Sequence, residues 1–334
     1  MSRRSFLLSA ALMPASLFPF KSPSGLWGYV DRSGKAVIAP AFESAGTFSD
    51  GLAAVRLAGR FGYIDDAGAV AVKPEHGEAL AFSEGLAGVS DGPGPGVFID
   101  RSGKPAFALE HCTPSGFHEG LAKIGKCAKE FKAGFIDRTG RIVLEMKYQD
   151  AGDFSEGLAR VLVNDATLGP RWGFIDKTGR SVADPVLLQA GDFSDGLAPV
   201  QFPPETCCTE VGKWGYIDPA GAVAIEPRPF FWAWSFADGL ARIQTHDGKM
   251  GYIAKTGALA VPPTLADALD FSEGLAGAKS GAKWGFIDKT GRFAIPAKFD
   301  AVEAYSGGLA KASVGKSDGY VDKNGNFVVR WRAR

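Results

Sequence analysis

The 334-residue chain has no surplus of either charge and lacks several motifs that identify common enzyme sites. Lys and Arg number 37, Asp and Glu also number 37, and no block of like charge occurs. A nucleic-acid partner or an anionic membrane surface therefore has no electrostatic support. There is no H-E-x-x-H pair, Walker-A loop or G-x-G-x-x-G phosphate loop. We expect no enzyme activity, no catalytic residues and no cofactor.

Long hydrophobic runs are also missing, and the one apolar stretch outside the pattern described below is Phe6–Phe20. It is too short to span a bilayer comfortably and follows Arg3 and Arg4, as in a signal peptide. Ser2–Leu7 resembles a twin-arginine export signal, with an ordinary secretory signal as the alternative. We predict that residues 1–24 are an export signal, removed or disordered. The protein is then periplasmic or secreted, without stable membrane insertion.

Glycine is abundant, with 44 residues, and it marks an internal repeat. A W-G-[FY]-I-D pattern recurs every 34 to 42 residues, which is typical of a repeat architecture. Copies begin at Trp27, Phe61, Gly96, Ala133, Trp172, Trp214, Met250 and Trp284, and a partial ninth copy begins at Asp318. We predict that residues 25–334 form a single repeat domain.

Each copy reads as three short antiparallel strands. In the first, W-G-Y-V-D has strand chemistry, and Asp31–Gly34 forms a turn. A second strand contains Pro40, which lacks an N–H donor and should end the pairing or sit at an edge. A third strand begins in F-S-D-G-L-A after Phe48. One such unit buries too little apolar area alone, so neighbours must stack. We expect the second-position glycine to let a neighbouring aromatic side chain approach the backbone.

The predicted fold is therefore all-β, with about eight and a half three-stranded units of roughly 34–42 residues in an open, twisted stack. A closed β-propeller is the alternative. A propeller usually has four strands per blade and closes by sharing a blade between the chain ends. Here we count three strands, and ahead of Trp27 only the short segment Ser24–Leu26 is available to complete the ninth unit.

The pattern W-G-[FY]-I-D-x-x-G, followed by I-x-P and F-x-[ED]-G-L-A, resembles the WG-repeat family of bacterial proteins. The resemblance covers the chain from Trp27 to about Trp331. Val97 departs from it by replacing the second-position glycine. The resemblance implies a repeat scaffold of unassigned or binding function, and it brings no catalytic residues. An acid precedes G-L-A in seven copies, which favours a turn, capping or ladder role over catalysis.

Four cysteines occur in the longer connections of the middle copies: Cys112, Cys127, Cys207 and Cys208. In an exported protein, Cys112 and Cys127 could form a disulfide, or all four could remain separate thiols. Alternatively, Cys207 and Cys208 could pair with each other, or one of them could pair with Cys127. His111 and His118 lie nearby, but the spacing is not that of a specific metal site, and we predict none.

Copy six carries an insertion and a dense aromatic run that includes Phe230, Phe231, Trp232 and Trp234. The repeat does not account for all of these rings, and exposed rings could hold a sugar or a partner's apolar side chains. We therefore predict a non-enzymatic scaffold of the cell envelope that binds a protein or glycan through these rings and the middle connectors. A hydrolase with its site in those connectors and a purely structural spacer are the alternatives. Burial of Trp232 and Trp234 would favour the spacer.

Overall fold

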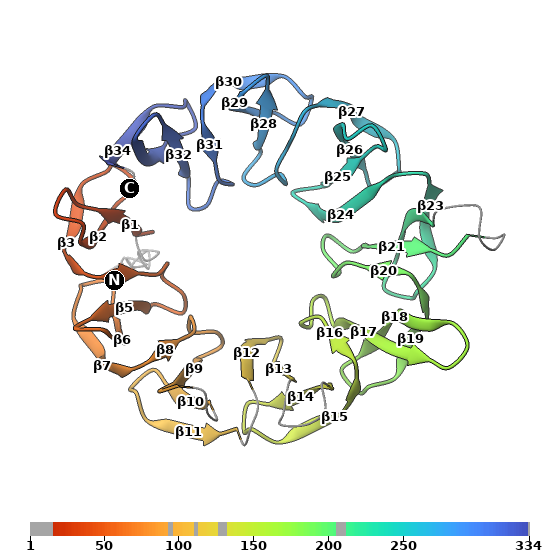
Figure 1. The fold of residues 1–334 in the computed structure, drawn as a ribbon, viewed down its shortest axis with the longest axis horizontal. Helices are drawn as coiled ribbons and strands as arrows, with labels where there is room; N and C mark the ends of the chain where they lie inside the picture. The colour runs from red at the N-terminus through yellow and green to blue at the C-terminus, as the bar shows by residue number, and fades with distance from the viewer. Residues whose placement is uncertain (1–15, 93–95, 110–112, 126–131, 205–211, 333–334) are drawn as a thin grey trace, which may run out of the picture.

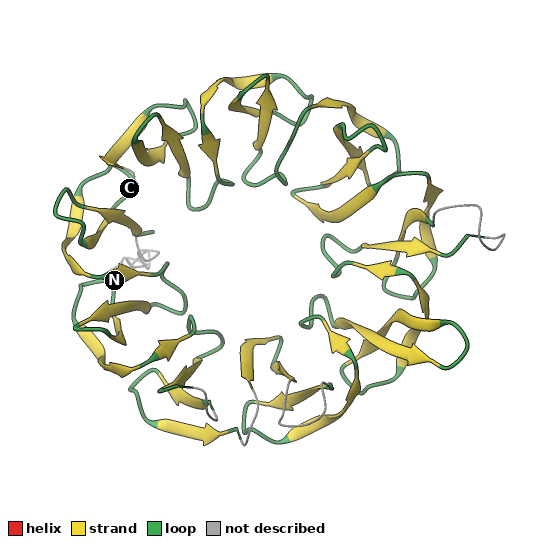
Figure 2. Ribbon diagram, viewed as in Figure 1, coloured by secondary structure: helices red, strands yellow, loops and turns green. Residues whose placement is uncertain are grey.

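The computed structural model describes residues 16–92, 96–109, 113–125, 132–204 and 212–332. All regular elements in these residues are β-strands (Figure 2). No helix is present in the described part of the chain, so none there could cross a membrane. Nine small antiparallel sheets stand around a central opening (Figure 1), and we number them blades 1 to 9 in chain order.

The strands have the following bounds. Blade 1 holds β1 (Phe18–Lys21), β2 (Trp27–Val30) and β3 (Ala36–Phe42); blade 2 holds β4 (Ser44–Ala45), β5 (Ala53–Leu57), β6 (Arg60–Ile64) and β7 (Val70–His76); blade 3 holds β8 (Glu78–Ala79), β9 (Leu86–Ser90), β10 (Val97–Asp100) and β11 (Pro105–Ala108). Blade 4 holds β12 (Thr113–His118), β13 (Leu121–Gly125), β14 (Ala133–Asp137) and β15 (Ile142–Tyr148); blade 5 holds β16 (Asp150–Ala151), β17 (Leu158–Asp165), β18 (Gly169–Asp176) and β19 (Ser181–Leu187); blade 6 holds β20 (Gln189–Ala190), β21 (Ala198–Phe202), β22 (Lys213–Ile217) and β23 (Val223–Arg228). Blade 7 holds β24 (Trp232–Ala237), β25 (Leu240–Gln244), β26 (Met250–Ala254) and β27 (Leu259–Leu265); blade 8 holds β28 (Ala276–Ser280), β29 (Lys283–Ile287) and β30 (Phe293–Phe299); blade 9 holds β31 (Ala301–Val302), β32 (Ala310–Val314), β33 (Ser317–Val321) and β34 (Phe327–Arg332).

The blades are offset from the sequence repeat. The G-L-A strand β5 pairs with β6, which begins the next copy, so one blade takes two strands from each of two copies. The first strand of a blade lies nearest the centre and the last lies at the rim (Figure 1). In five blades this innermost strand has only two residues, as in β4. The predicted count of three strands per unit is wrong for most blades, because this short strand lies within a run that looks irregular in sequence.

The predicted turn is confirmed in detail. The Asp31 carboxylate accepts hydrogen bonds from the backbone N–H groups of Ser33 (2.8 Å) and Lys35 (3.1 Å). Gly34 closes the turn at a φ of 82°, which favours glycine. The Ser33 hydroxyl also donates to the carboxylate, and this bond is the main reason that the pKa of Asp31 is lowered. The same turn recurs in the other copies.

The second-position glycine has a different role from the one we expected. A β-bulge shifts the register between Trp27↔Phe42 and Tyr29↔Ile38, and it presses the β3 backbone against Gly28. A Cβ atom at Gly28 would lie 2.5 Å from the Ile38 carbonyl oxygen, so backbone rather than an aromatic ring occupies the space. In blade 3 the pairing shows no shift at Val97, which explains why a side chain is tolerated there.

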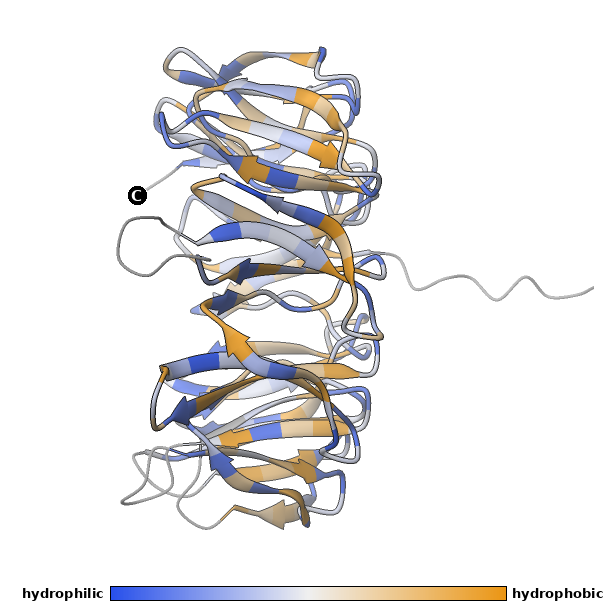
Figure 3. Cartoon of the chain, turned by 90° about the vertical axis from the view of Figure 1, so that its right-hand side faces the viewer, coloured by the Kyte–Doolittle hydropathy of each residue, from blue (hydrophilic) through white to orange (hydrophobic). Residues whose placement is uncertain are grey.

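The hydrophobic core consists of nine clusters, and each joins two adjacent blades. Tyr29 and Ile38 of blade 1, for example, pack with Val55 and Ile64 of blade 2. The side view shows the blades stacked one against another, with apolar and polar stretches alternating along the strands (Figure 3). The prediction that each unit needs its neighbours is consistent with this arrangement.

The repeated acids connect successive blades, because each carboxylate accepts a hydrogen bond from a glycine N–H of the next blade. Asp50 contacts Gly85 in this way at 2.7 Å, and six further pairs follow: Glu84–Gly120, Glu119–Gly157, Glu156–Gly196, Asp195–Gly239, Asp238–Gly274 and Glu273–Gly308. All seven acids have φ between 50° and 55°, a region that disfavours side chains. Their capping bond to the next blade offsets this strain.

The ring is closed by direct contact between blade 9 and blade 1. Phe18 and Val30 share a core cluster with Leu309, and the Tyr320 hydroxyl donates to the Pro19 carbonyl oxygen across 3.0 Å. β1 and β34 lie side by side at this junction (Figure 1). The predicted open stack is therefore wrong, and the closed propeller that we gave as the alternative is the observed fold.

The strand that we could not find for closure comes from the N-terminal segment. Residues 18–21, which we assigned to the export signal, form β1 and pair with β2. Leu17 and Phe18 are each only 8% exposed, so this segment is part of the fold. Residues 1–15 lie outside the described residues, and their role in export stays a prediction.

Candidate binding site on the seventh blade

The aromatic run of copy six forms β24, the innermost strand of blade 7. This strand has six residues, as does β12 of blade 4, whereas the innermost strand of five other blades has two. Trp232 pairs with Gln244, and the Phe231 N–H donates to the Gln244 carbonyl oxygen at 2.8 Å. A register shift between Ala233 and Phe236 changes which side chains face inward.

The four predicted contact residues divide into two groups. Phe231 is 55% exposed and Trp232 is 38% exposed, so these two rings reach the surface. Trp234 is half-buried, and Phe230 is half-buried against the core cluster between blades 6 and 7. The repeat aromatic Phe236 is buried.

These rings belong to a larger cluster that crosses from blade 7 to blade 6. The Trp232 ring centroid lies 4.9 Å from Trp214 of β22 and 6.3 Å from Trp234. The Arg242 guanidinium lies 4.0 Å from the Trp234 centroid, and Phe231 meets His246 edge-on at 5.9 Å. We call the residues Trp214, Phe231, Trp232, Trp234, Arg242 and His246 the aromatic patch.

Sequence reasoning missed Trp214, Arg242 and His246 as members of the patch. Trp214 begins a repeat copy and looked like a structural residue, and its 2% exposure shows that it supports Trp232 from below. Its indole N–H is buried without an acceptor among the described residues. No sequence signal pairs Trp214 with Trp232, because their contact depends on how two blades meet.

Two arginine–carboxylate pairs cross blade boundaries near the centre of the ring. Arg242 lies 3.1 Å from Asp270 of the next blade, and Arg160 lies 2.9 Å from Asp192 in the same way. Burial raises the pKa of Asp192, although the nearby Arg160 opposes that shift. Both carboxylates are therefore engaged by arginine, and Arg242 is held between Asp270 and the Trp234 ring.

Gly88–Gly92 reads G-x-S-x-G, the sequence pattern of the nucleophile elbow in serine hydrolases. In a nucleophile elbow the serine sits on a sharp turn between a strand and a helix. Ser90 instead ends β9, and its hydroxyl lies 3.4 Å from a Glu78 carboxylate oxygen. No helix is present in the described residues, so this motif lacks the elbow's structural context.

The cysteine predictions stay untested. Cys112, Cys127, Cys207 and Cys208 lie outside the described residues, as does His111. His118 is described, and its Nε2 lies 3.7 Å from an Asp153 carboxylate oxygen. Within the part of the chain that the structure describes, no group of three His, Cys, Asp or Glu residues could hold a metal ion.

The fold and the repeated contacts between blades define a closed, nine-bladed β-propeller. A model of the WG containing repeat matches residues 27–60, 61–92, 134–165, 172–202, 214–249, 250–284 and 284–316. These matches cover more than half of the chain, so the protein belongs to the WG containing repeat family, as its sequence indicated. No match was found among curated proteins.

Solved structures share the fold at low sequence identity. The crystal structure of a eukaryotic initiation factor has a TM-score of 0.67 at 12% identity, with 96% of each chain covered. AztD from Citrobacter koseri has a TM-score of 0.48 at 12% identity, with 92% of each chain covered. BamB from Moraxella catarrhalis has a TM-score of 0.45 at 14% identity, with 80% of this chain and 89% of that chain covered. At this identity, the likeness to the initiation factor shows a shared fold alone.

Proposed function

We propose that the protein is a non-enzymatic binding scaffold that holds a protein or glycan partner at the aromatic patch. The carrying observation is the exposure of Trp232, at the start of β24, and of Phe231 immediately before it. Large rings that are exposed above a buried ring supply contact area at a small entropic cost. Burial of both tryptophans would have favoured a spacer, whereas Trp232 is 38% exposed, which supports binding.

The chemistry around the patch also supports binding rather than hydrolysis. Glycosidases use a pair of carboxyl groups that flank the bond to be cut. Asp270 and Asp192 are each paired with an arginine, and the repeated acids are bound to glycine N–H groups. A ring in which each blade is held by both of its neighbours is a rigid support for the aromatic patch, and this favours binding of a partner.

We propose further that the scaffold works in the bacterial cell envelope. This part of the proposal rests on Arg3, Arg4 and the apolar stretch that follows them. Fractionation of cells that express the full chain tests it. Recovery in the periplasm or medium is expected, and loss of export in an Arg3→Gln/Arg4→Gln variant would support the twin-arginine route.

The binding proposal is tested with three purified proteins: the full chain, a Phe231→Ala/Trp232→Ala variant and a Phe293→Ala control. Phe293 is 38% exposed, like Trp232, but lies on β30 of blade 8. Each protein is immobilised and offered envelope glycans in one arm and envelope proteins in the other, after circular dichroism confirms folding.

We expect the full chain and the Phe293→Ala control to retain a glycan or a protein. We expect the Phe231→Ala/Trp232→Ala variant to lose it. The arm that gives this result identifies the class of partner. Equal retention by all three proteins would place binding elsewhere on the ring. No retention by the full chain in either arm would favour the spacer.

A further inference from the structure

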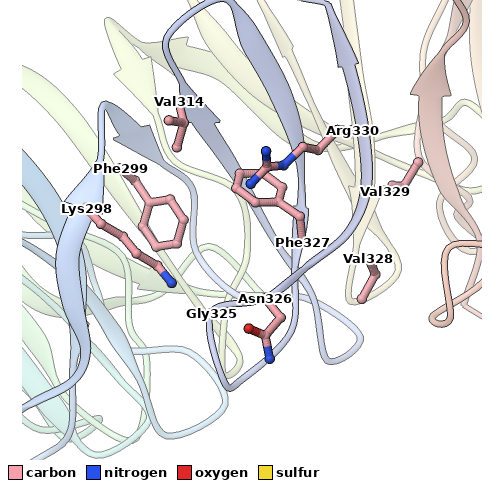
Figure 4. A pocket seen from close by; sticks show the side chains of 9 residues that line it. All are labelled: Lys298, Phe299, Val314, Gly325, Asn326, Phe327, Val328, Val329 and Arg330. Carbon is pink, nitrogen blue, oxygen red and sulfur yellow. The ribbon is translucent and has the colours of Figure 1, made fainter.

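A cavity of about 600 Å³ opens between blades 8 and 9, away from the aromatic patch. It lies on the rim side, where β30 of one blade faces β34 of the next (Figure 4). Phe327 is half-buried and contributes its aromatic surface, and the buried Phe299 supports that ring, with centroids 5.9 Å apart and planes at 76°. Lys298 and Arg330 lie at its edges, and both side chains are exposed.

The cavity exists because the last blade departs from the repeat. In most other blades the register of the two outer strands shifts at the second-position glycine, as after Trp284↔Phe299 in blade 8. In blade 9, β34 pairs with β33 without that shift from Ser317 to Tyr320. Phe327 consequently turns toward Phe299 of blade 8 and leaves a gap beside it.

The charge of the cavity is positive. The Arg330 guanidinium lies 3.9 Å from the Phe327 centroid, and the Lys298 ammonium lies 5.3 Å from the Phe299 centroid. No Asp or Glu lines the cavity, and neither cation forms an ion pair with a carboxylate in the described residues. Both positive charges are thus available to a ligand, and the rings hold them in place.

The residue at the position of Arg330 differs in charge among the blades, and Lys73 of blade 2 is also positive there. Arg330 is the fifth residue after the turn glycine Gly325, and the same position in blades 4, 5 and 6 is held by Glu145, Asp184 and Glu226. Blade 9 therefore places a positive charge where these three blades place a negative one. This reversal occurs at the junction that has the cavity.

We propose that this cavity binds a small organic anion whose carboxylate or phosphate is held by Lys298 and Arg330. The apolar body of the ligand packs against Phe327, whose ring rests on the buried Phe299. Arg330 can offer two parallel N–H donors to either kind of anion, and Lys298 adds a point charge. The site is independent of the aromatic patch, because it lies on different blades and binds a small anion, whereas the patch holds a protein or glycan.

Isothermal titration calorimetry on the full chain tests the proposal with phenyl phosphate, benzoate and inorganic phosphate. Phenyl phosphate or benzoate is expected to bind with a stoichiometry of one. Inorganic phosphate, which has no apolar body, is expected to bind at least about tenfold more weakly than phenyl phosphate. Whichever of the first two binds more tightly identifies the preferred anionic group.

Two variants make the result specific. Lys298→Gln/Arg330→Gln is expected to lower the affinity by at least about tenfold, whereas Lys316→Gln, an exposed lysine outside the cavity, is expected to leave it unchanged. Both variants are first shown to be folded, with the same circular dichroism spectrum and the same urea unfolding midpoint as the parent chain. Absence of binding by the parent chain, or equal binding by the parent and the double variant, would overturn the proposal.

Discussion

The Tyr320 hydroxyl donates to the Pro19 carbonyl oxygen at 3.0 Å and so joins residues that are 301 positions apart. Tyrosines at the same repeat position make the equivalent bond between other blades, as Tyr29 does to Gly46 at 2.8 Å and Tyr63 to Leu80 at 2.6 Å. The junction that closes the ring therefore uses the same contact as the junctions within the chain.

Tyr320→Phe is expected to lower the free energy of unfolding by about 1 kcal/mol, because it removes one buried hydrogen bond and little volume. Urea unfolding followed by tryptophan fluorescence measures the change. Tyr148→Phe is the matched control, since Tyr148 is buried and its hydroxyl has no hydrogen-bond partner among the described residues. A loss in the control as large as that in Tyr320→Phe would contradict the closing role of this bond.

Removal of β1 is expected to weaken the ring much more. A chain that begins at Gly25 lacks Leu17 and Phe18, which are each 8% exposed in the ring. Burial of two such side chains contributes roughly 3–6 kcal/mol. A chain that begins at Ser16 keeps both and is the control. Equal urea midpoints for the two shortened chains would show that β1 does not contribute to closure.

Asp238→Ala tests the links between blades, because this carboxylate accepts from the Gly274 N–H at 2.6 Å and from Lys289 Nζ at 2.8 Å. We expect a loss of roughly 1–2 kcal/mol at neutral pH, reduced by partial exposure. Asp66→Ala, at an exposed turn residue without a described partner, is expected to have little effect.

The effect of Asp238→Ala is also expected to depend on pH. The bond from Lys289 lowers the pKa of Asp238 below its ordinary value of 3.8. The stabilisation is therefore present above pH 3.8 and is lost as the pH falls through the lowered pKa. The difference between the parent chain and the variant should shrink in acid, and a constant difference down to about pH 2 would contradict the charged role of Asp238.

Gly62→Ala is expected to lower the free energy of unfolding by roughly 1–3 kcal/mol or more, because its Cβ would lie 2.5 Å from the Val72 carbonyl oxygen. The clash is with backbone, which cannot rotate away. At Gly46 an added Cβ would find its nearest neighbour at 3.4 Å, so Gly46→Ala is the control and should change the urea midpoint little. A tolerated Gly62→Ala would mean that the bulge can relax.

Alkaline titration is expected to unfold the ring. Burial raises the pKa of Tyr63, Tyr216 and Tyr252 well above the ordinary value of 10. The folded state favours the neutral phenol, so the stabilisation is present below pH 10 and is lost as the pH rises above it. Tyrosinate absorbance and near-ultraviolet circular dichroism should therefore change together. Complete ionisation by about pH 11 with an intact dichroism spectrum would contradict the burial of these hydroxyls.

Much of the aromatic patch could be predicted from the sequence, because copy six contains more rings than one strand can bury. Phe231 and Trp232 are exposed as expected, whereas Phe230 packs against the core between blades 6 and 7. The register shift within β24 decides which ring turns inward, and no residue pattern reports that shift. Trp214 and Arg242 could not be assigned to the patch because they come from other strands.

The sequence by itself determined the local structure: the repeat, the Asp31–Gly34 type of turn and the pairing of the first two strands of a copy, since these depend on residues a few positions apart. Only the tertiary structure decided that the stack closes and that it has nine blades. Closure depends on the angle between blades and on contacts such as Phe18 with Leu309, which lie at opposite ends of the chain. Small differences in that angle add up over nine junctions, so a repeat pattern alone does not distinguish a ring from an open stack.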